Sequence, residues 1–166
     1  MVQFFILYTC SIILAIAVVR DRKIKSKRVV LASDHAGFKL KEEIKKFLIR
    51  KKRKVLDLGT KNTSSVDYPD YAHLLSKKMN KSENQFGILI CGSGTGMSMT
   101  ANKHKNIRAA LCYDTKSTRL SRLHNNANVM TIGARLIKKN DALKCVNVFL
   151  RTDFDGGRHL RRIKKI

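Results

Sequence analysis

The strongest constraint on the fold is the order in which short apolar runs and amphipathic segments alternate from residue 27 onward. Apolar runs of strand length occur at 28–32, 54–58, 86–90, 107–112 and 128–132. Segments with helical periodicity separate or follow them, at about 38–48, 71–79, 95–103, 115–124 and 140–150. Such alternation, with strands that are apolar throughout, predicts an α/β domain whose parallel sheet is covered by helices on both faces.

Polar and reactive side chains stand directly after several of the predicted strands. In open α/β sheets, ligands bind in the crevice outside the carboxyl ends of the strands, so these positions indicate where a site would lie. The segments are Ser33-Asp34-His35-Ala36-Gly37, Cys91-Gly92-Ser93-Gly94-Thr95-Gly96, Tyr113-Asp114 and Gly133-Ala134-Arg135.

The glycine-rich segment 91–96 matches neither of the common nucleotide motifs. It lacks the G-x-x-x-x-G-K of a P-loop, and Met97 stands where the dinucleotide fingerprint has its third glycine. Asp114, which follows Gly94 by twenty residues, keeps a nucleotide site open as a weaker alternative. The glycines allow backbone amides to turn toward one point at the start of a helix, where they stabilise a phosphate or a developing oxyanion. We therefore interpret the segment as an anion receptor.

Cys91 opens this segment. A thiol beside the positive end of a helix has its pKa lowered from about 8.5 toward about 3.5–7.5, which makes a thiolate available as a base or nucleophile. The competing interpretation is a small buried hydrophobe at the end of a strand. Cys112 and Cys145 fall inside a predicted strand and helix without a comparable loop, so we interpret them as structural.

Histidines and arginines supply the other candidate groups. His35 and His124 fall in polar segments that we interpret as loops, although each side chain is also compatible with a purely structural role. Arg158 and Arg162 follow Gly156-Gly157, and the arginine fork suits bidentate phosphate binding. The default interpretation of this tail is a solvated basic terminus.

Positive charge is far in excess of what solubility requires. The chain has 35 Lys and Arg against 12 Asp and Glu, a formal charge of +23. Either compositional drift or attraction to an anionic ligand accounts for this excess, and a basic nucleic-acid-binding module is a hypothesis of a different class. We rank that module below an enzyme because the sequence has no aromatic RNA-binding motif, zinc finger or tryptophan.

Residues 1–26 form an apolar, then basic, N-terminal extension. Residues 1–19 carry no charge, and six cations follow between Arg20 and Arg28. The extension is compatible with a minimal membrane span, a signal-like segment or a start codon assigned too early. If it spans, the positive-inside rule keeps the following residues in the cytoplasm, where we expect the domain formed by residues 27–166. Membrane attachment depends on whether residues 1–19 are retained.

Six motifs in a fixed order closely resemble the type B ribose-5-phosphate isomerase family, which also contains galactose-6-phosphate isomerase subunits. The resemblance covers about residues 28–163. It implies a three-layer, Rossmann-like α/β/α sandwich with a five-stranded parallel sheet, no metal or organic cofactor, and a homodimer or dimer of dimers with shared active sites. The motifs are 33–37, Asp67-Tyr68-Pro69, 91–96, Arg119 through Leu123-His124-Asn125, 133–135 and Gly156-Gly157-Arg158-His159.

The resemblance also implies roles for individual residues. Cys91 would be the base that moves a proton between C2 and C1 of the open-chain sugar through a cis-enediolate. Ser93 would assist proton transfer to oxygen, and His124 would open the furanose ring. The remaining positions would hold the enediolate (Asn125 and the amides of Gly92, Gly94, Thr95 and Gly96), line the pocket (Asp34 and Tyr68) or bind the phosphate (His35, Arg135, Arg158 and Arg162).

This chemistry is physically consistent with the residues themselves. Removing a proton from carbon beside a carbonyl generates an enediolate, which requires a placed base and preformed oxyanion donors. We therefore expect reversible interconversion of D-ribose 5-phosphate and D-ribulose 5-phosphate. Isomerisation of a six-carbon substrate, such as allose or galactose 6-phosphate, is the near alternative, because it needs only a roomier pocket.

Overall fold

A five-stranded parallel sheet forms the centre of the computed structural model, which describes residues 27–79 and 85–166. The strand order is β2-β1-β3-β5-β4, and every neighbouring pair is parallel. This order reverses between β1 and β3, the kind of switch point at which open α/β sheets bind ligands. The strands are β1 Arg28–Ser33, β2 Val55–Asp57, β3 Gln85–Cys91, β4 Ala109–Leu111 and β5 Val129–Gly133.

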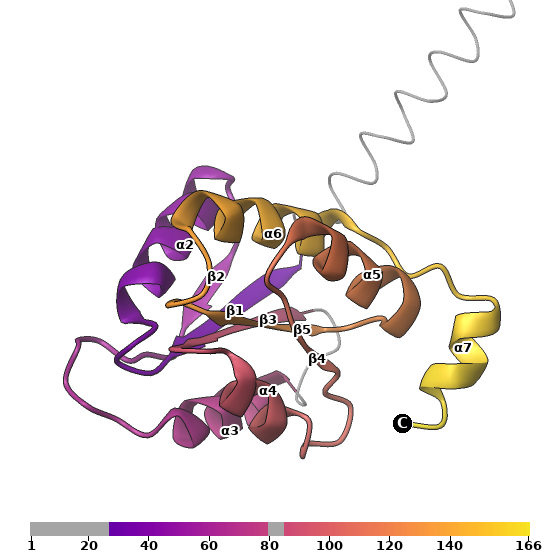
Figure 1. Ribbon diagram of the computed structural model, residues 1–166, viewed down its shortest axis with the longest axis horizontal. Coiled ribbons are helices and arrows are strands. Elements are labelled where there is room, and N and C mark those ends of the chain that lie inside the picture. Colours follow the sequence, from indigo (N-terminus) through magenta and orange to yellow (C-terminus); the bar gives the residue numbers. More distant parts are fainter. Residues whose placement is uncertain (1–26, 80–84) are drawn as a thin grey trace, which may run out of the picture.

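Helices cover both faces of the sheet (Figure 1). One face carries α2 (Phe38–Arg50), α5 (Thr115–Asn125) and α6 (Lys139–Arg151), and the other carries α3 (Tyr68–Met79) and α4 (Thr95–Ala101). A last short helix, α7 (Arg158–Ile163), stands beside α5 at the edge of the sandwich. The predicted three-layer α/β/α architecture is therefore confirmed.

The central strand β3 explains why its sequence is apolar without alternation. All seven of its residues are buried. Ile88 and Ile90 pack in the core between the sheet and helices α2 and α6, whereas Leu89 and Cys91 pack in the core on the α3 and α4 side. Because successive side chains point to opposite faces, a strand with helices on both faces needs apolar residues at every position.

Two elements differ from the sequence expectation. Helix α3 begins at Tyr68, three residues earlier than predicted, and Pro69 lies in its first turn, where a missing N–H leaves no hydrogen bond broken. Helix α7 was not predicted, because the tail was interpreted as a basic terminus. Its start follows two glycines with positive φ, Gly156 and Gly157, and His159 in its first turn is buried. A tertiary contact, rather than apolar periodicity, anchors α7.

The N-terminal extension, residues 1–26, lies outside the described residues, so its interpretation and the expected cytoplasmic location of the domain stay predictions. Among the helices of residues 27–79 and 85–166, none combines the length and apolarity needed to cross a bilayer.

A buried lysine ties α2 to the end of β2. The Lys41 side chain is 1% exposed, and its Nζ donates to Asp57 Oδ1 at 2.7 Å and to the Thr60 carbonyl at 2.8 Å. Lys45 Nζ also donates to Asp57, at 2.7 Å. The Thr60 N–H donates to the Ser33 carbonyl at 2.8 Å, so this ion cluster holds the segment after β2 against the end of β1.

Because of this ion cluster, the free energy of unfolding should vary with pH in the acid range. Burial alone would raise the pKa of Asp57, but hydrogen bonds from Lys41, Lys45 and the Gly59 N–H outweigh it and hold that pKa below its usual value. A lowered folded-state pKa stabilises the fold above the unfolded-state pKa of about 3.9, and this contribution is lost as pH falls through the folded-state value.

We therefore expect Asp57→Asn to lower the free energy of unfolding by about 2 kcal/mol at pH 7, because it removes one charge-assisted partner of the buried Lys41 and leaves the Glu42 carboxylate, at 3.1 Å, to pair with it. Denaturant unfolding at pH 7 and pH 3 measures this, and the difference between the variant and the wild type should be smaller at the lower pH. Asp141→Asn, which removes the exposed pair with Lys144, is the control and should cost about 0–1 kcal/mol. An Asp57→Asn deficit of equal size at both pH values would contradict the assignment.

Candidate active site

The carboxyl ends of β1, β3 and β5 bring together three of the segments singled out in the sequence. The Asp34 N–H donates to the Ile90 carbonyl at 3.2 Å, which places the loop after β1 against the end of β3. On the other side, the Ala134 N–H donates to the Cys91 carbonyl at 2.8 Å. The glycine-rich loop after β3 therefore lies between the other two loops, as the topology predicts.

Cys91 stands at the centre of this arrangement. Its side chain is 5% exposed, and its Sγ accepts a hydrogen bond from the Gly94 N–H at 3.1 Å. Gly94 has φ of +80°, and a Cβ there would lie 2.6 Å from Leu111 Cδ1 and 2.8 Å from the Ile132 carbonyl carbon. Only glycine fits this position without strain. In this backbone conformation the Gly94 amide points at the sulfur.

Arg135 brings positive charge to the same loop. Its N–H donates to the Gly92 carbonyl at 3.0 Å, and a Cβ added to Gly92 would lie 3.3 Å from the guanidinium carbon. The guanidinium therefore lies over the backbone of the loop. Ser93 and Thr95 are exposed beside it, with the Thr95 N–H 3.4 Å from Ser93 Oγ.

Asp34 and His35 are fixed by backbone groups. Asp34 is buried, and its Oδ1 accepts from the Gly37 N–H at 2.9 Å, which closes the turn before α2. His35 Nδ1 lies 3.2 Å from both the N–H and the carbonyl of Val66. In the tautomer in which Nδ1 accepts from the amide, Nε2 carries the proton and can donate to an anion.

Tyr68 reaches the glycine-rich loop from the start of α3. A Cβ added to Gly96 would lie 2.6 Å from the Tyr68 ring, so the absence of a side chain at Gly96 lets the ring lie against the loop. Tyr68 is partly exposed at this position. The structure thus gathers one group of predicted residues at the carboxyl edge of the sheet: Asp34, His35, Tyr68, Cys91, Gly92, Ser93, Gly94, Thr95, Gly96 and Arg135.

A second group lies elsewhere. His124 and Asn125 are the last residues of α5, not part of a loop as expected, and the left-handed turn begins at Asn126 with φ of 46°. The His124 ring stacks on the ring of His159 in α7, with centroids 4.3 Å apart and planes 9° apart. Arg158 and Arg162 extend from the same helix. His159 had no role in the sequence interpretation, although it belongs to one of the six motifs.

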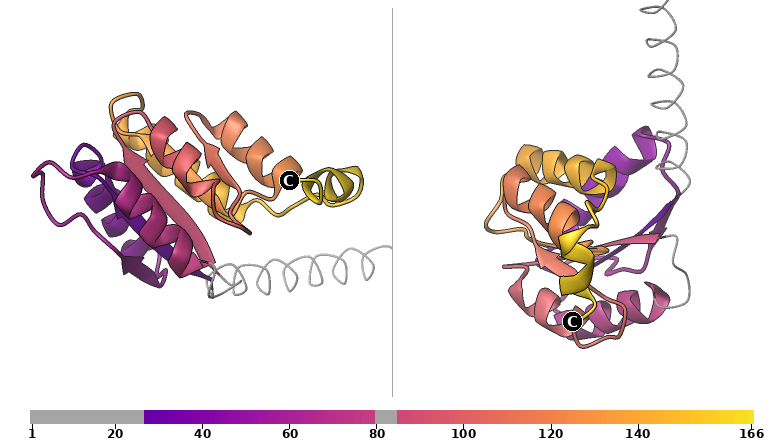
Figure 2. Two further views of the ribbon diagram at one scale, coloured as in Figure 1. Left: turned by 90° about the horizontal axis from the view of Figure 1, so that it is seen from below. Right: turned by 90° about the vertical axis from the view of Figure 1, so that its right-hand side faces the viewer.

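The second group sits at the amino edge of the sheet. The carbonyl of Asn128, three residues after the end of α5, accepts from the Gly87 N–H at 2.9 Å near the start of β3. Cys91 lies four residues further along this strand, a separation of about 13 Å. In Figures 1 and 2, α7 likewise stands on the far side of the molecule from the loop that precedes α3. Within one copy of the chain, the two groups do not meet.

Positive charge and desolvation act together on the second group. Partial burial, with the neighbouring His124, Arg158 and Arg162, holds the pKa of His159 below its ordinary value. Ligand atoms of His124, Asp155 and His159 lie within 4.8 Å of one another, the spacing of a metal cluster. However, a bound ion lies in the plane of each imidazole that holds it, and two nearly parallel stacked rings do not converge on one ion. The arrangement therefore does not fit a metal site.

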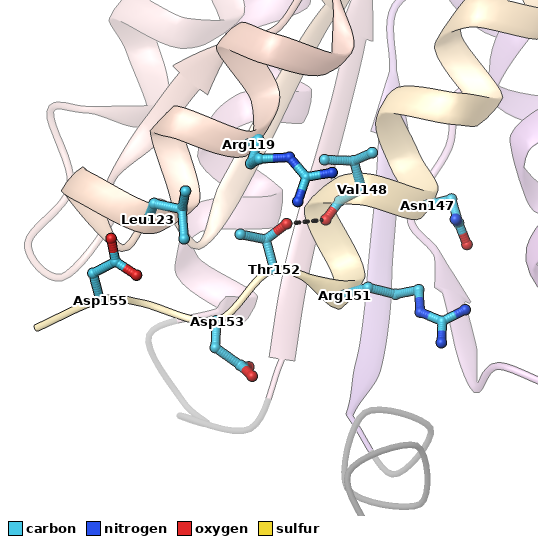
Figure 3. A pocket seen from close by; sticks show the side chains of 8 residues that line it. All are labelled: Arg119, Leu123, Asn147, Val148, Arg151, Thr152, Asp153 and Asp155. Atoms are coloured by element: carbon cyan, nitrogen blue, oxygen red, sulfur yellow. Dashed lines mark hydrogen bonds between the residues drawn. The ribbon is translucent and has the colours of Figure 1, made fainter. Parts of the chain in front are cut away.

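Two other features lie apart from both groups. Asp114, kept open above as a nucleotide ligand, caps α5 by accepting from the Ser117 N–H at 2.6 Å. A cavity of about 420 Å³ opens between α5, α6 and residues 152–155 (Figure 3). Arg119 lines this cavity, but none of the predicted site residues does.

Comparison with known proteins identifies the chain's relatives. A family model described as Ribose/Galactose Isomerase matches residues 29–166. The chain belongs to this ribose/galactose isomerase family. The probable ribose-5-phosphate isomerase B of Mycoplasma pneumoniae is 45% identical over 139 residues, which cover 83% of this chain and 91% of that protein.

Solved structures of ribose/galactose isomerases share the fold. A ribose 5-phosphate isomerase from Thermotoga maritima superimposes with a TM-score of 0.82 and 49% identity, covering 84% of this chain and 97% of that one. The ribose-5-phosphate isomerase B of Mycoplasma genitalium, solved with bound ribulose-5-phosphate, gives a TM-score of 0.81 and 43% identity, covering 84% and 93%.

The geometry at Gly94 generates a prediction for this isomerase. Gly94→Ala should displace the amide that donates to Cys91 Sγ and lower turnover by about 10–10²-fold, the usual value of one hydrogen bond to a charged group. Gly156→Ala is the matched control for stability, because Gly156 also has positive φ but no atom within 4 Å of its added Cβ. Turnover assays and thermal unfolding of both variants test this. Equal stability losses, with turnover unchanged in Gly94→Ala, would refute it.

Proposed function

We propose that this protein interconverts D-ribose 5-phosphate and D-ribulose 5-phosphate. The observation that carries the proposal is the Cys91 sulfur held against a glycine-built loop of amides at the switch point of the sheet. Family membership supports it, because the relative from Escherichia coli is named ribose-5-phosphate isomerase B, and the structure of the relative from Mycoplasma genitalium holds ribulose-5-phosphate.

The reaction follows from the chemistry of this edge of the sheet. Cys91, as the thiolate, removes the proton from C2 of the open-chain aldose, and the electron pair moves to O1 to give a cis-enediolate. The amides of residues 92–96 stabilise the negative charge, and the Ser93 hydroxyl assists proton movement between O1 and O2. Return of the proton to C1 yields the ketose, so no atom is gained or lost.

The anion-binding groups hold the far end of the sugar. Arg135 lies over the glycine-rich loop, and His35 stands in the loop after β1, which contacts the end of β3 in the same copy. Binding the phosphate at a distance from the reacting carbons orients a small flexible substrate, and this orientation lowers the barrier to proton transfer. Arg158 and Arg162 are the further phosphate ligands, and His124 opens the furanose ring with Asn125 beside the enediolate.

Because the two groups of residues lie at opposite edges of the sheet, a complete site needs a second copy of the chain. We place His124, Asn125, Arg158 and Arg162 of one copy against Cys91 of the other, in a homodimer or a dimer of dimers. Exposed apolar side chains on the elements next to the glycine-rich loop support a contact there: Met99 in α4 is 66% exposed, Tyr113 just after β4 is 62% exposed, and Leu111 of β4 borders Gly94. Exposed apolar clusters of this kind are typical of protein interfaces.

The first test is turnover by the Cys91→Ala variant. We expect ketose formation from ribose 5-phosphate to fall by about 10²–10⁴-fold, the usual contribution of a positioned base, with thermal unfolding little changed. Cys112→Ala is the control, because this thiol is buried on the opposite face and burial raises its pKa to about 11. Wild-type activity in Cys91→Ala would remove the assigned base. Comparing kcat/KM for ribose 5-phosphate, allose 6-phosphate and galactose 6-phosphate decides between five- and six-carbon substrates.

The second test addresses the shared site. Cys91→Ala and His124→Asn should each be nearly inactive alone, but co-refolded mixtures form heterodimers in which one of the two sites has both groups intact. With random pairing, we expect about one quarter of wild-type activity. Mixing the folded homodimers without refolding is the control. No recovery after subunit exchange would show that each copy builds its own site.

A further inference from the structure

Arg122 is a buried cation that the reaction as described does not use. It lies in the last turn of α5, two residues before His124, and is 5% exposed. Its guanidinium lies over the rings of Phe86 and Phe149, with centroid distances of 5.0 and 5.6 Å. Burial lowers its pKa to about 10, so the group still carries its charge at neutral pH.

The Arg122 guanidinium bonds to two separate segments of the chain. Nη1 donates to the Ala127 carbonyl at 2.5 Å and to Asn126 Oδ1 at 3.0 Å, in the turn after α5. Nε donates to the Thr152 carbonyl at 3.0 Å. Thr152 begins the strap, residues 152–157, that connects α6 to α7. One planar cation therefore joins the turn after α5 to the start of the strap.

Each of these segments leads to one half of the second group. The turn after α5 directly follows His124 and Asn125, and the strap leads to Arg158 and Arg162. The strap is tied to α5 once more, where the Asp155 N–H donates to the Leu123 carbonyl at 3.1 Å. The stacking of His124 on His159 depends on the same alignment of α5 with α7.

We propose that Arg122 is a positioning residue for the isomerisation, which holds the ring-opening His124 and the phosphate-binding arginines of α7 in register. This proposal rests on the proposed function, and it places the effect of Arg122 in the site completed by Cys91 of the second copy. Arg122 touches neither substrate nor the reacting atoms. It acts through the turn after α5 and the strap.

The chemistry of the position calls for arginine. The guanidinium presents several N–H donors in a fixed plane and stacks on aromatic rings, whereas an ammonium is a strongly hydrated point charge. A lysine at this position would leave the Thr152 or Ala127 carbonyl without its donor, and a buried polar group without a partner is costly. The contrast with Arg119, one turn earlier on α5, is direct: Arg119 is exposed and points into the cavity of Figure 3.

The experiment compares full-length Arg122→Lys with the control Arg119→Lys in steady-state assays on ribose 5-phosphate. Misplacement of binding groups by about 1 Å costs on the order of 10²-fold, so we expect kcat/KM of Arg122→Lys to fall by about that factor, with a raised KM for the phosphorylated sugar. Arg119→Lys should match the wild type. Asn126→Gly, which keeps the left-handed turn but removes one acceptor, is a milder variant and should raise KM several-fold in the same direction.

Subunit mixing gives a measurement that would not change if Arg122 only stabilised the fold. Co-refolded with Cys91→Ala, Arg122→Lys should recover activity to the level of the Cys91→Ala and His124→Asn mixture, because one site then has both groups intact. Co-refolded with His124→Asn it should gain nothing, because both changes damage the same group.

Three outcomes would overturn the proposal. One is a lowered melting temperature in Arg122→Lys and Asn126→Gly with kcat and KM unchanged, which assigns Arg122 to stability alone. Another is failure of the Arg122→Lys and Cys91→Ala mixture while the Cys91→Ala and His124→Asn mixture recovers, which places the effect of Arg122 within its own copy. Failure of both mixtures removes the shared site and this role together.

Discussion

The pairing of β3 with β1 on one side and β5 on the other is the constraint on which the rest of the structure depends. Its register sets Ser33 beside Ile90 and Cys91 beside Gly133, so the loops after three strands emerge at one edge. The backbones then pass so closely that a Cβ on Gly37 would lie 2.3 Å from the Ile90 carbonyl oxygen, and one on Gly133 would lie 2.5 Å from that of Ser93. The site is built from backbone as much as from side chains.

Parallel topology also explains why the candidate site residues fall into two separate groups. A helix that connects parallel strands runs back across the sheet, so residues at its end lie at the opposite edge from residues at its start. Asp114 therefore caps the beginning of α5 near the carboxyl ends of the strands, while His124 and Asn125 lie near the amino ends. In the proposed assembly, a second copy of the chain brings its His124 and Asn125 to the carboxyl edge, which those residues cannot reach within their own copy.

Local signals were strong enough to predict the five strands and the first five described helices. They succeeded because β3 and the faces of α2 and α6 bury apolar side chains whose spacing is visible in the sequence. They failed at α7, which has no apolar stripe and is anchored by one histidine stacked on another. The overall excess of cations was equally uninformative about individual residues. Lys41 and Arg122 are buried parts of the framework, and composition could not separate them from solvated charges.

The sequence by itself determined the fold class, the glycine-rich loop with its cysteine, and the family, because strand and helix periods and the glycine spacing are local properties of the chain. Only the tertiary structure decided which candidate residues meet. Strand order and helix direction are set by long-range packing. They place at opposite edges of the sheet residues whose motifs look equally important in the sequence. They also reveal that Lys41 and Arg122 are buried, since a charge is recognised as internal only when its acceptors, distant in the chain, are seen around it.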